Sequence, residues 1–203
     1  MKTEFTMLKV TYGEFGVLGA NNYLLTDDRS GEAALIDCSS DKEDMIHFIE
    51  GANLKYILLT HGHFDHCDGV KGIAERTGAK IVIAEADHKM SADTTANVSR
   101  LFGDGWIAYT PDLLIHDGDI LHLGEEEIKV IATPGHTPGS VCYLAGNHLF
   151  TGDTIMVGGY GRTDFPGGNQ DQLVSSLMKI IPFTKNNNFY PGHGSIQLLK
   201  DNK

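Results

Sequence analysis

The sequence predicts an α/β fold of the α+β kind: two β-sheets pack face to face and helices cover both outer faces, giving a four-layer αββα sandwich. Two observations predict it. Short strands with interspersed helices occur in both halves of the chain, and no internal repeat, low-complexity tract or linker divides it. Hydrophobic residues make up 41% of the 203 residues and charged residues 21%, which is typical of a globular protein with a hydrophobic core. Because a single core stops growing only at about 250 residues, we expect residues 1–203 to form one domain.

The residue pattern in the first half of the chain predicts five strands and two helices. Ser40 and Glu43 have the spacing of a capping box and predict the start of a helix that ends near Gly51. A second helix is expected at 65–77, with Gly78 as its C-terminal stop. The expected strands share apolar runs bounded by turn residues, and they lie at 8–12, 22–26, 33–37, 56–59 and 80–84.

The second half predicts a sheet, one long helix and an irregular segment. Residues 86–111 hold few periodic apolar positions, so we expect a lid or flap there, with Trp106 and Tyr109 lining a substrate cleft. Asn169 predicts the cap of a helix that Pro182 ends. The expected strands lie at 113–115, 120–123, 128–132, 141–144 and 148–151, with a last one near 189–190.

Charge and cysteine content restrict the compartment and the partners. Sixteen Lys and Arg against 27 Asp and Glu give a net charge of −11, which argues against nucleic acid and anionic membranes as partners. The chain starts without an apolar signal segment, and it contains no run of about 18 apolar residues. Three cysteines without a C-x-x-C pair suit reduced thiols. We therefore expect a cytoplasmic protein that acts on a small-molecule substrate, and the sequence leaves its oligomeric state open.

A cluster of potential metal ligands follows the strand at 56–59. It comprises His61, His63, Asp65 and His66 in the pattern H-x-H-x-D-H. Residues two apart in an extended segment point the same way, so His61 and His63 can bind one ion together. Asp65 and His66, at the start of the next helix, are offset from that pair and can reach a second ion. Imidazole and carboxylate suit zinc, iron or manganese better than calcium or Cu(I).

Three more ligand residues follow apolar strands in turns rich in Gly and Pro: His136, Asp153 and His193. Taken alone, a histidine or aspartate in such a turn is commonly a surface residue. Because loops at strand ends gather at one edge of a sheet, we expect these three side chains to converge on the first cluster and complete two sites.

The order of these seven residues resembles the metallo-β-lactamase-fold hydrolase superfamily over nearly the whole chain. The resemblance implies the metallo-β-lactamase fold, which is the αββα sandwich expected above. It also implies that one metal is held by His61, His63 and His136, that a second is held by Asp65, His66 and His193, and that Asp153 bridges them.

By this resemblance the chain is a metallo-hydrolase with two divalent metal ions, zinc in the first place and iron or manganese as alternatives. Two such ions lower the pKa of bound water to about 7, so a hydroxide at the dinuclear site attacks the substrate without a side-chain nucleophile. Asp65 is expected to orient this hydroxide and to accept its proton as the catalytic residue.

The stretch at 159–167, Gly-Tyr-Gly-Arg-Thr-Asp-Phe-Pro-Gly, resembles a segment that glyoxalase II-like thioesterases and persulfide dioxygenases carry after the bridging Asp. In the glyoxalase II relatives a basic residue matching Arg162 helps to hold a glutathione carboxylate, and a guanidinium matches a carboxylate bidentately. Arg162 and Tyr160 are therefore the expected substrate-binding residues. An internal ion pair between Arg162 and Asp164 that shapes the loop is the alternative.

The resemblance thus implies a hydroxyacylglutathione hydrolase-like enzyme that cleaves a thioester of the S-acylglutathione type. Only 203 − 193 = 10 residues follow the last ligand, so we expect the C-terminal helical domain of full-length glyoxalase II enzymes to be absent. Two alternatives stay open. One is a persulfide dioxygenase-like oxidoreductase with a single iron held by residues matching His61, His136 and Asp153, and the other is a catalytically idle metal-binding protein of the same fold.

Overall fold

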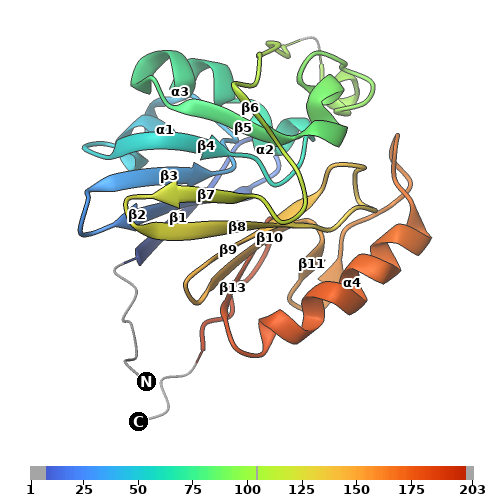
Figure 1. Ribbon diagram of the computed structural model, residues 1–203. Coiled ribbons are helices and arrows are strands. Elements are labelled where there is room, and N and C mark those ends of the chain that lie inside the picture. Colours follow the sequence, from blue (N-terminus) through green and yellow to red (C-terminus); the bar gives the residue numbers. More distant parts are fainter. Residues whose placement is uncertain (1–7, 104, 200–203) are drawn as a thin grey trace.

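The computed structural model describes residues 8–103 and 105–199, and two β-sheets packed face to face form its centre (Figure 1). Helices α1 (Glu43–Phe48) and α3 (Val70–Thr77) lie on the outer face of the first sheet, and α4 (Gln170–Thr184) lies on the outer face of the second. The predicted αββα sandwich is confirmed.

The first sheet has six strands in the order β1-β2-β3-β4-β5-β6. The pairs β1–β2 and β2–β3 are antiparallel, whereas β3 to β6 run parallel. Since the carboxyl ends of parallel strands meet at one edge, the residues that follow β3, β4 and β5 are brought together there. The strands are β1 (Leu8–Phe15), β2 (Ala20–Asp27), β3 (Glu32–Ile36), β4 (Asn53–Leu58), β5 (Lys80–Ala84) and β6 (Leu113–Ile115).

The second sheet has five strands in the order β13-β10-β9-β8-β7. Strands β7 to β10 form an antiparallel meander, and β13 pairs with β10 in parallel, so the turns that follow these last two strands lie side by side. A small hairpin of β11 (Ile155–Met156) and β12 (Gly159–Tyr160), which the sequence does not predict, follows β10. The five strands are β7 (Ile120–Leu123), β8 (Glu126–Ala132), β9 (Val141–Ala145), β10 (His148–Gly152) and β13 (Asn188–Pro191).

Three clusters of buried apolar residues hold the layers together. The largest lies between the two sheets, where the ring of Tyr23 contacts Phe150 with 5.4 Å between centroids. The second joins the first sheet to α1 and α3 through side chains such as Met45 and Ile73, and the third joins the second sheet to Ile180 of α4. Burial of each such side chain stabilises the fold by about 1.5–3 kcal/mol relative to exposure.

Two helix ends agree with the sequence-based expectation. Gly78 adopts φ 74 after α3 and donates its N–H to the Ala74 carbonyl, as a C-terminal glycine cap does. The side chain of Asn169 caps α4 by accepting from Gln172 N–H.

Three other expectations about helices are wrong. Ser40 forms no capping box, because its Oγ accepts from Lys42 N–H in a turn and α1 begins at Glu43. The helix expected at 65–77 is divided into α2 (Phe64–Cys67) and α3, and at the break Gly69 N–H donates to the Cys38 carbonyl instead of continuing the helix. Pro182 lies inside α4, in a last turn that tolerates the loss of one backbone donor.

Residues 86–111 contain two 3₁₀ helices, η1 (Glu85–Ser91) and η2 (Ser99–Leu101). The expectation that Trp106 and Tyr109 line the substrate cleft is wrong. Their ring centroids lie 5.9 Å apart, both rings pack in the cluster between the first sheet and helices α1 and α3, and Trp106 Nε1 donates to the Ser91 carbonyl. Aromatic character alone does not distinguish these two core positions from cleft positions.

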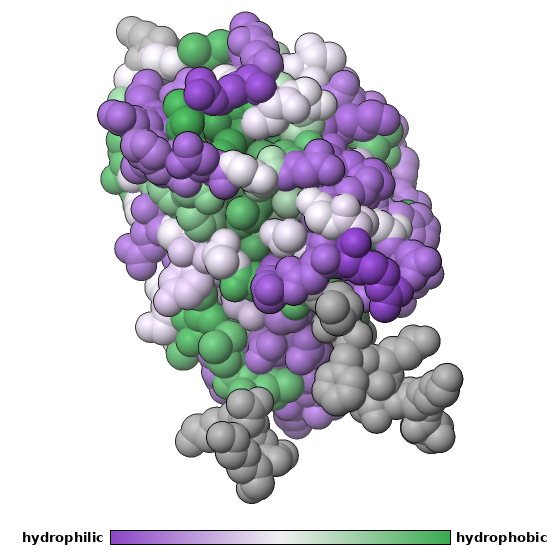
Figure 2. Space-filling view, turned by 90° about the vertical axis from the view of Figure 1, so that its left-hand side faces the viewer, coloured by the Kyte–Doolittle hydropathy of each residue, from purple (hydrophilic) through white to green (hydrophobic). Residues whose placement is uncertain are grey.

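Hydrophilic side chains cover most of the surface that Figure 2 shows, and the apolar side chains between them form smaller groups. The three cysteines are buried and free, which agrees with the absence of a disulfide framework. Within the described residues, no helix has the length and apolar character needed to cross a membrane.

Candidate metal centre

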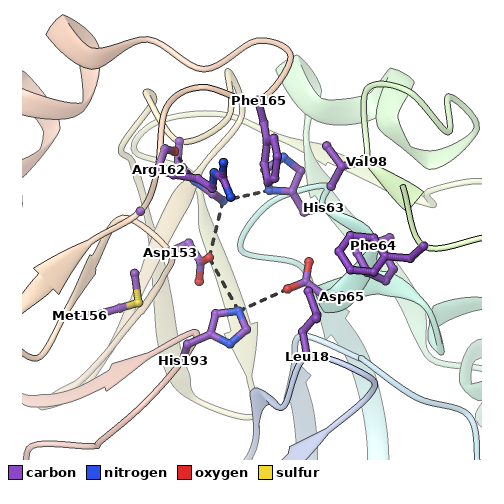
Figure 3. A pocket seen from close by; sticks show the side chains of 13 residues that line it. Leu18, His63, Phe64, Asp65, Val98, Asp153, Met156, Arg162, Phe165 and His193 are labelled. Carbon is purple, nitrogen blue, oxygen red and sulfur yellow. Dashed lines mark hydrogen bonds and ion pairs between the residues drawn. The ribbon is translucent and has the colours of Figure 1, made fainter. Parts of the chain in front are cut away.

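Turns from both sheets meet at one edge of the sandwich and bring the seven predicted ligand residues together there. Five of them line a pocket of about 270 Å³ (Figure 3), whereas His61 and His66 lie outside its lining. Five of these side chains are buried, and those of Asp153 and His193 are partly open to the pocket. The ligand residues follow β4, β8, β10 and β13, so the topology of the two sheets determines this convergence. The seven residues are His61, His63, Asp65, His66, His136, Asp153 and His193.

The ligand atoms of these residues form three groups in which all atoms lie within 4.8 Å of one another. Two groups coincide with the two sets of three that the family resemblance implies, and the third joins Asp153 to one histidine from each set. The groups are His61, His63 and His136; Asp65, His66 and His193; and His61, His66 and Asp153.

In the first group, imidazole nitrogen atoms of different residues face one another at short range. His63 Nδ1 lies 2.9 Å from His136 Nε2. His136 Nδ1 donates to the Arg162 carbonyl at 2.7 Å, which leaves the Nε2 lone pair directed toward His63. The Nε2 atoms of His61 and His63 are buried and have no hydrogen-bond partner. A bound cation would satisfy several of these lone pairs at once.

In the second group, His66 Nε2 lies 3.2 Å from His193 Nε2, and Asp65 Oδ2 lies 3.3 Å from the same His193 atom. Asp153 stands between the groups. Its Oδ1 is 3.5 Å from His66 Nε2, and its Oδ2 is 3.6 Å from His136 Nε2. This carboxylate can therefore contact cations in both positions, as expected of a bridging ligand.

Burial keeps two of the histidines neutral. It lowers the pKa of His61, with His66 adding to the effect, and together with the neighbouring His136 it lowers the pKa of His63 to about 3. Because both rings are uncharged at pH 7, a cation can bind their lone pairs without first displacing a proton.

His66 has the opposite electrostatic environment. Burial acts to lower its pKa, but the carboxylates of Asp37, Asp65 and Asp153 outweigh burial and raise that pKa to about 10. The same carboxylates that hold a proton on His66 would attract a metal cation to the place where His66 faces His193.

Asp37 is a site residue that the sequence analysis missed. It directly follows β3, it is buried, and its backbone has the left-handed φ of 58. Its carboxylate accepts from Thr60 N–H at 2.8 Å, from the Thr60 hydroxyl at 2.9 Å and from His66 Nδ1 at 2.8 Å. With Nδ1 donating to Asp37, His66 directs its Nε2 to the centre, where a bound cation would take the place of the Nε2 proton. An aspartate at the end of an apolar strand, beside the strand that leads to the ligand cluster, was the available signal.

Asp87 in η1 is a second missed residue, and it joins two ligand-bearing turns. Its carboxylate accepts from Gly62 N–H at 2.9 Å, from Gly139 N–H at 2.6 Å and from the Thr137 hydroxyl at 2.6 Å. The turn that carries His61 is thereby fixed to the turn that carries His136. Asp87 lies in a segment without apolar periodicity, so nothing in the sequence pattern indicates this role.

Side chains of β2 hold the turn that carries His193 in place through hydrogen bonds. Asn21 Nδ2 donates to the carbonyls of Pro191 and Gly194, and the Tyr23 hydroxyl donates to the Pro191 carbonyl. His193, a ligand candidate near the end of the described chain, is thus positioned by side chains from near its beginning.

Of the two predicted substrate-binding residues, Arg162 lines the pocket, whereas Tyr160 lies exposed on β12 outside its lining. The Arg162 guanidinium donates two hydrogen bonds of 2.6 Å to Asp164 and lies 4.0 Å from the Phe165 ring centroid. The internal ion pair that the sequence left as an alternative therefore forms.

The donor set fits divalent cations. Imidazoles and carboxylates face one another in these groups, two buried imidazole nitrogens and Asp153 Oδ1 lack hydrogen-bond partners, and the carboxylates attract positive charge. Such nitrogen and oxygen ligands suit zinc, iron and manganese, and the geometry does not choose among them.

Comparison with known proteins agrees with this geometry. A family model described as the metallo-β-lactamase superfamily matches residues 15–193. The chain is 34% identical over 190 residues to the hydroxyacylglutathione hydrolase GloC of Haemophilus influenzae, a match that covers 90% of this chain and 89% of the relative.

Two solved structures are similar over nearly their whole lengths. The crystal structure of the B3 metallo-β-lactamase BLEG-1 superposes with a TM-score of 0.86 at 31% identity, covering 93% of each chain. The crystal structure of TTHA1623 in a di-iron-bound form superposes with a TM-score of 0.82 at 26% identity, covering 93% of this chain and 94% of that one.

Proposed function

The chain belongs to the metallo-β-lactamase superfamily, and on this premise we propose that it is a metal-dependent hydrolase that cleaves a thioester of the S-acylglutathione type. The observation that carries the proposal is the convergence of the seven ligand candidates in one cluster, five of which line a pocket that Arg162 also lines. The similarity to a hydroxyacylglutathione hydrolase supports the substrate class.

In this proposal one cation is held by the first group of three histidines and a second by Asp65, His66 and His193, with Asp153 between them. Bound divalent cations supply Lewis acidity and lower the pKa of water to about 7. Zinc is our first choice of metal, with iron or manganese as alternatives.

Asp65 is the residue that we assign to proton transfer. Burial acts to raise the pKa of its carboxyl, but His66 and His193 outweigh burial and hold it well below its usual range, so Asp65 is ionised at neutral pH. Its carboxylate lines the pocket and can accept a proton from an attacking water.

The overall reaction balances without a redox partner. A C–O bond forms between water and the acyl carbon, and the C–S bond breaks. One proton of the water moves to Asp65 and then to the departing thiolate. A thiolate is a good leaving group, so the reaction does not need a separate general acid beside Asp65.

Arg162 is the residue that we assign to the thiol part of the substrate. Its ion pair with Asp164 is solvent-exposed, and water screens such a pair, so a substrate carboxylate can compete with Asp164. We also assign Tyr160, which is exposed two residues earlier, to the part of a substrate that extends beyond the pocket.

The proposal also includes a compartment and a partner. Free thiols at Cys38, Cys67 and Cys142 support the reducing cytoplasm as the location. A pocket of about 270 Å³ supports a small molecule as the substrate.

The test compares two reactions of the metal-loaded protein: hydrolysis of S-lactoylglutathione, and oxygen uptake with glutathione persulfide. Thioester cleavage without oxygen uptake is expected. Oxygen uptake with one bound iron would instead establish the persulfide dioxygenase alternative, whose ligand set of His61, His136 and Asp153 is not one of the three groups formed by the described residues. Neither reaction in a metal-loaded protein would identify a catalytically idle metal-binding protein.

A further inference from the structure

One side of the pocket is lined by apolar side chains that the proposed chemistry does not use. Leu18 comes from the turn between β1 and β2, Phe64 begins α2, and Val98 and Phe102 flank η2. We call these four residues the apolar wall. Figure 3 shows Phe64 and Val98 on one side of Asp65, with Asp153 on the other, so the wall adjoins the ligand cluster.

The apolar wall is partly open to solvent. Phe102 is 52% exposed and Leu18 is 45% exposed, and the ring of Phe102 stacks on Phe64 with 4.5 Å between centroids. Covering such surfaces with hydrocarbon removes apolar area from water on both partners and is therefore favourable.

Val98 is held in the wall against its backbone preference. Its φ is 59, a left-handed conformation that is rare for a β-branched residue. Hydrogen bonds on both sides keep the segment in place: Phe64 N–H donates to the Asn97 carbonyl, Asn97 Nδ2 donates to the Met90 carbonyl, and Ser99 N–H donates to Asn97 Oδ1. Strained backbone of this kind clusters at ligand sites, where the surrounding structure enforces it.

The apolar wall offers no side-chain hydrogen bond to a substrate. The polar side chains that line the pocket are the ligand candidates and Arg162, and Arg162 is paired with Asp164. Among the described lining residues, a hydroxyl group placed against the wall would find no side-chain partner, and it would lose its hydrogen bonds to water.

From these observations, and resting on the proposed thioester hydrolysis, we propose that the apolar wall is the subsite for an unsubstituted aliphatic acyl group. The enzyme then prefers S-acylglutathiones with simple aliphatic acyl chains to those with hydroxyacyl chains. Each added methylene that contacts the wall should raise kcat/KM about twofold to fourfold until the wall is covered.

A binding experiment tests the subsite without relying on turnover. The affinities of the metal-loaded protein for S-methylglutathione and S-hexylglutathione, which cannot be hydrolysed as thioesters, are measured by calorimetry. We expect the hexyl compound to bind at least tenfold more tightly. Phe102→Ala should reduce this ratio at least threefold, whereas Leu101→Ala should preserve it, because Leu101 is adjacent and exposed but lies outside the pocket lining.

Leu18→Ala, with the exposed neighbour Val17→Ala as its control, repeats the test on a different element in case Phe102→Ala does not fold. Equal affinities for the two compounds would overturn the proposal. So would a hexyl-to-methyl ratio that changes equally in the wall variants and in their controls.

A kinetic experiment then compares acetyl, butanoyl, hexanoyl and lactoyl thioesters of glutathione. The subsite is supported if kcat/KM rises from the acetyl to the hexanoyl thioester and if kcat/KM is lower for the lactoyl than for the butanoyl thioester. Cleavage of all four thioesters at equal kcat/KM, or a preference for lactoyl, overturns the subsite and leaves the proposed thioester hydrolysis standing. Selective binding of the hexyl compound without cleavage of any thioester overturns the proposed hydrolysis and supports the subsite.

Discussion

Replacing Asp37 by asparagine tests how the centre is organised without removing any ligand candidate. Asn accepts the left-handed backbone that Asp37 adopts, so the turn is retained. It replaces one carboxylate oxygen by an NH₂ group. The three donors that now meet the carboxylate, namely Thr60 N–H, the Thr60 hydroxyl and His66 Nδ1–H, cannot all be satisfied by the amide.

Two orientations of the amide are possible, and both carry a penalty. If the NH₂ group faces His66, the imidazole must accept at Nδ1 and carry its proton on Nε2, the nitrogen directed at the centre. If the amide is reversed, the NH₂ group meets Thr60 N–H, and a buried donor stays unsatisfied, which costs about 1–3 kcal/mol. Loss of a partner that orients a ligand histidine typically lowers metal affinity 10- to 100-fold, which corresponds to about 1.4–2.8 kcal/mol. The cost of the unsatisfied buried donor and the loss of metal-binding free energy are therefore of similar size.

The assay is competition of the protein with a chelator for divalent metal, followed by kcat for thioester hydrolysis. We expect Asp37→Asn to bind metal at least tenfold more weakly while its circular dichroism stays unchanged. Asp27→Asn is the matched control, because Asp27 is also buried and accepts two backbone N–H groups, but at the far end of β2. Unchanged affinity in Asp37→Asn, or an equal loss in the control, would refute the reasoning.

Three further outcomes are expected. His63→Ala and Asp153→Ala should each abolish thioester hydrolysis with the fold retained, as measured by initial rates and circular dichroism; full activity in either variant contradicts the ligand assignment. Gly161→Ala should lower activity at least tenfold because its Cβ would overlap the Asp153 carbonyl, whereas Gly159→Ala, which meets nothing within 4 Å, should be tolerated. Burial lowers the pKa of His148, so the unfolded chain, with a pKa near 6.5, binds more protons between pH 7 and 5. Over that range the free energy of unfolding, measured in urea, should therefore fall more in the parent than in His148→Gln, and parallel slopes would contradict the pKa shift.

The sequence predicts the layers of the fold because strand patterns repeat in both halves and the ligand residues follow strands. It also predicts the helix ends at Gly78 and Asn169, where one residue is sufficient for the local geometry. The break between α2 and α3 was not predictable, because Gly69 N–H donates there to the Cys38 carbonyl, which is distant along the chain.

The candidate site likewise contains residues that the sequence reveals and residues that it does not. Residues such as His61 and His63 are recognisable because their types and spacing are rare by chance and because they share one strand end. The residues that hold them in place are ordinary in the sequence. Asp87 acts through hydrogen bonds to Gly62 and Gly139, which only the tertiary structure brings together.

The most direct test of the account is the amount of divalent metal that stays bound per chain after purification without added metal and dialysis. Two ions per chain are predicted for the parent protein, with loss of bound metal in His63→Ala and in His193→Ala. A parent protein that retains a single ion, or variants that retain as much metal as the parent, would contradict a centre built from two groups of ligands.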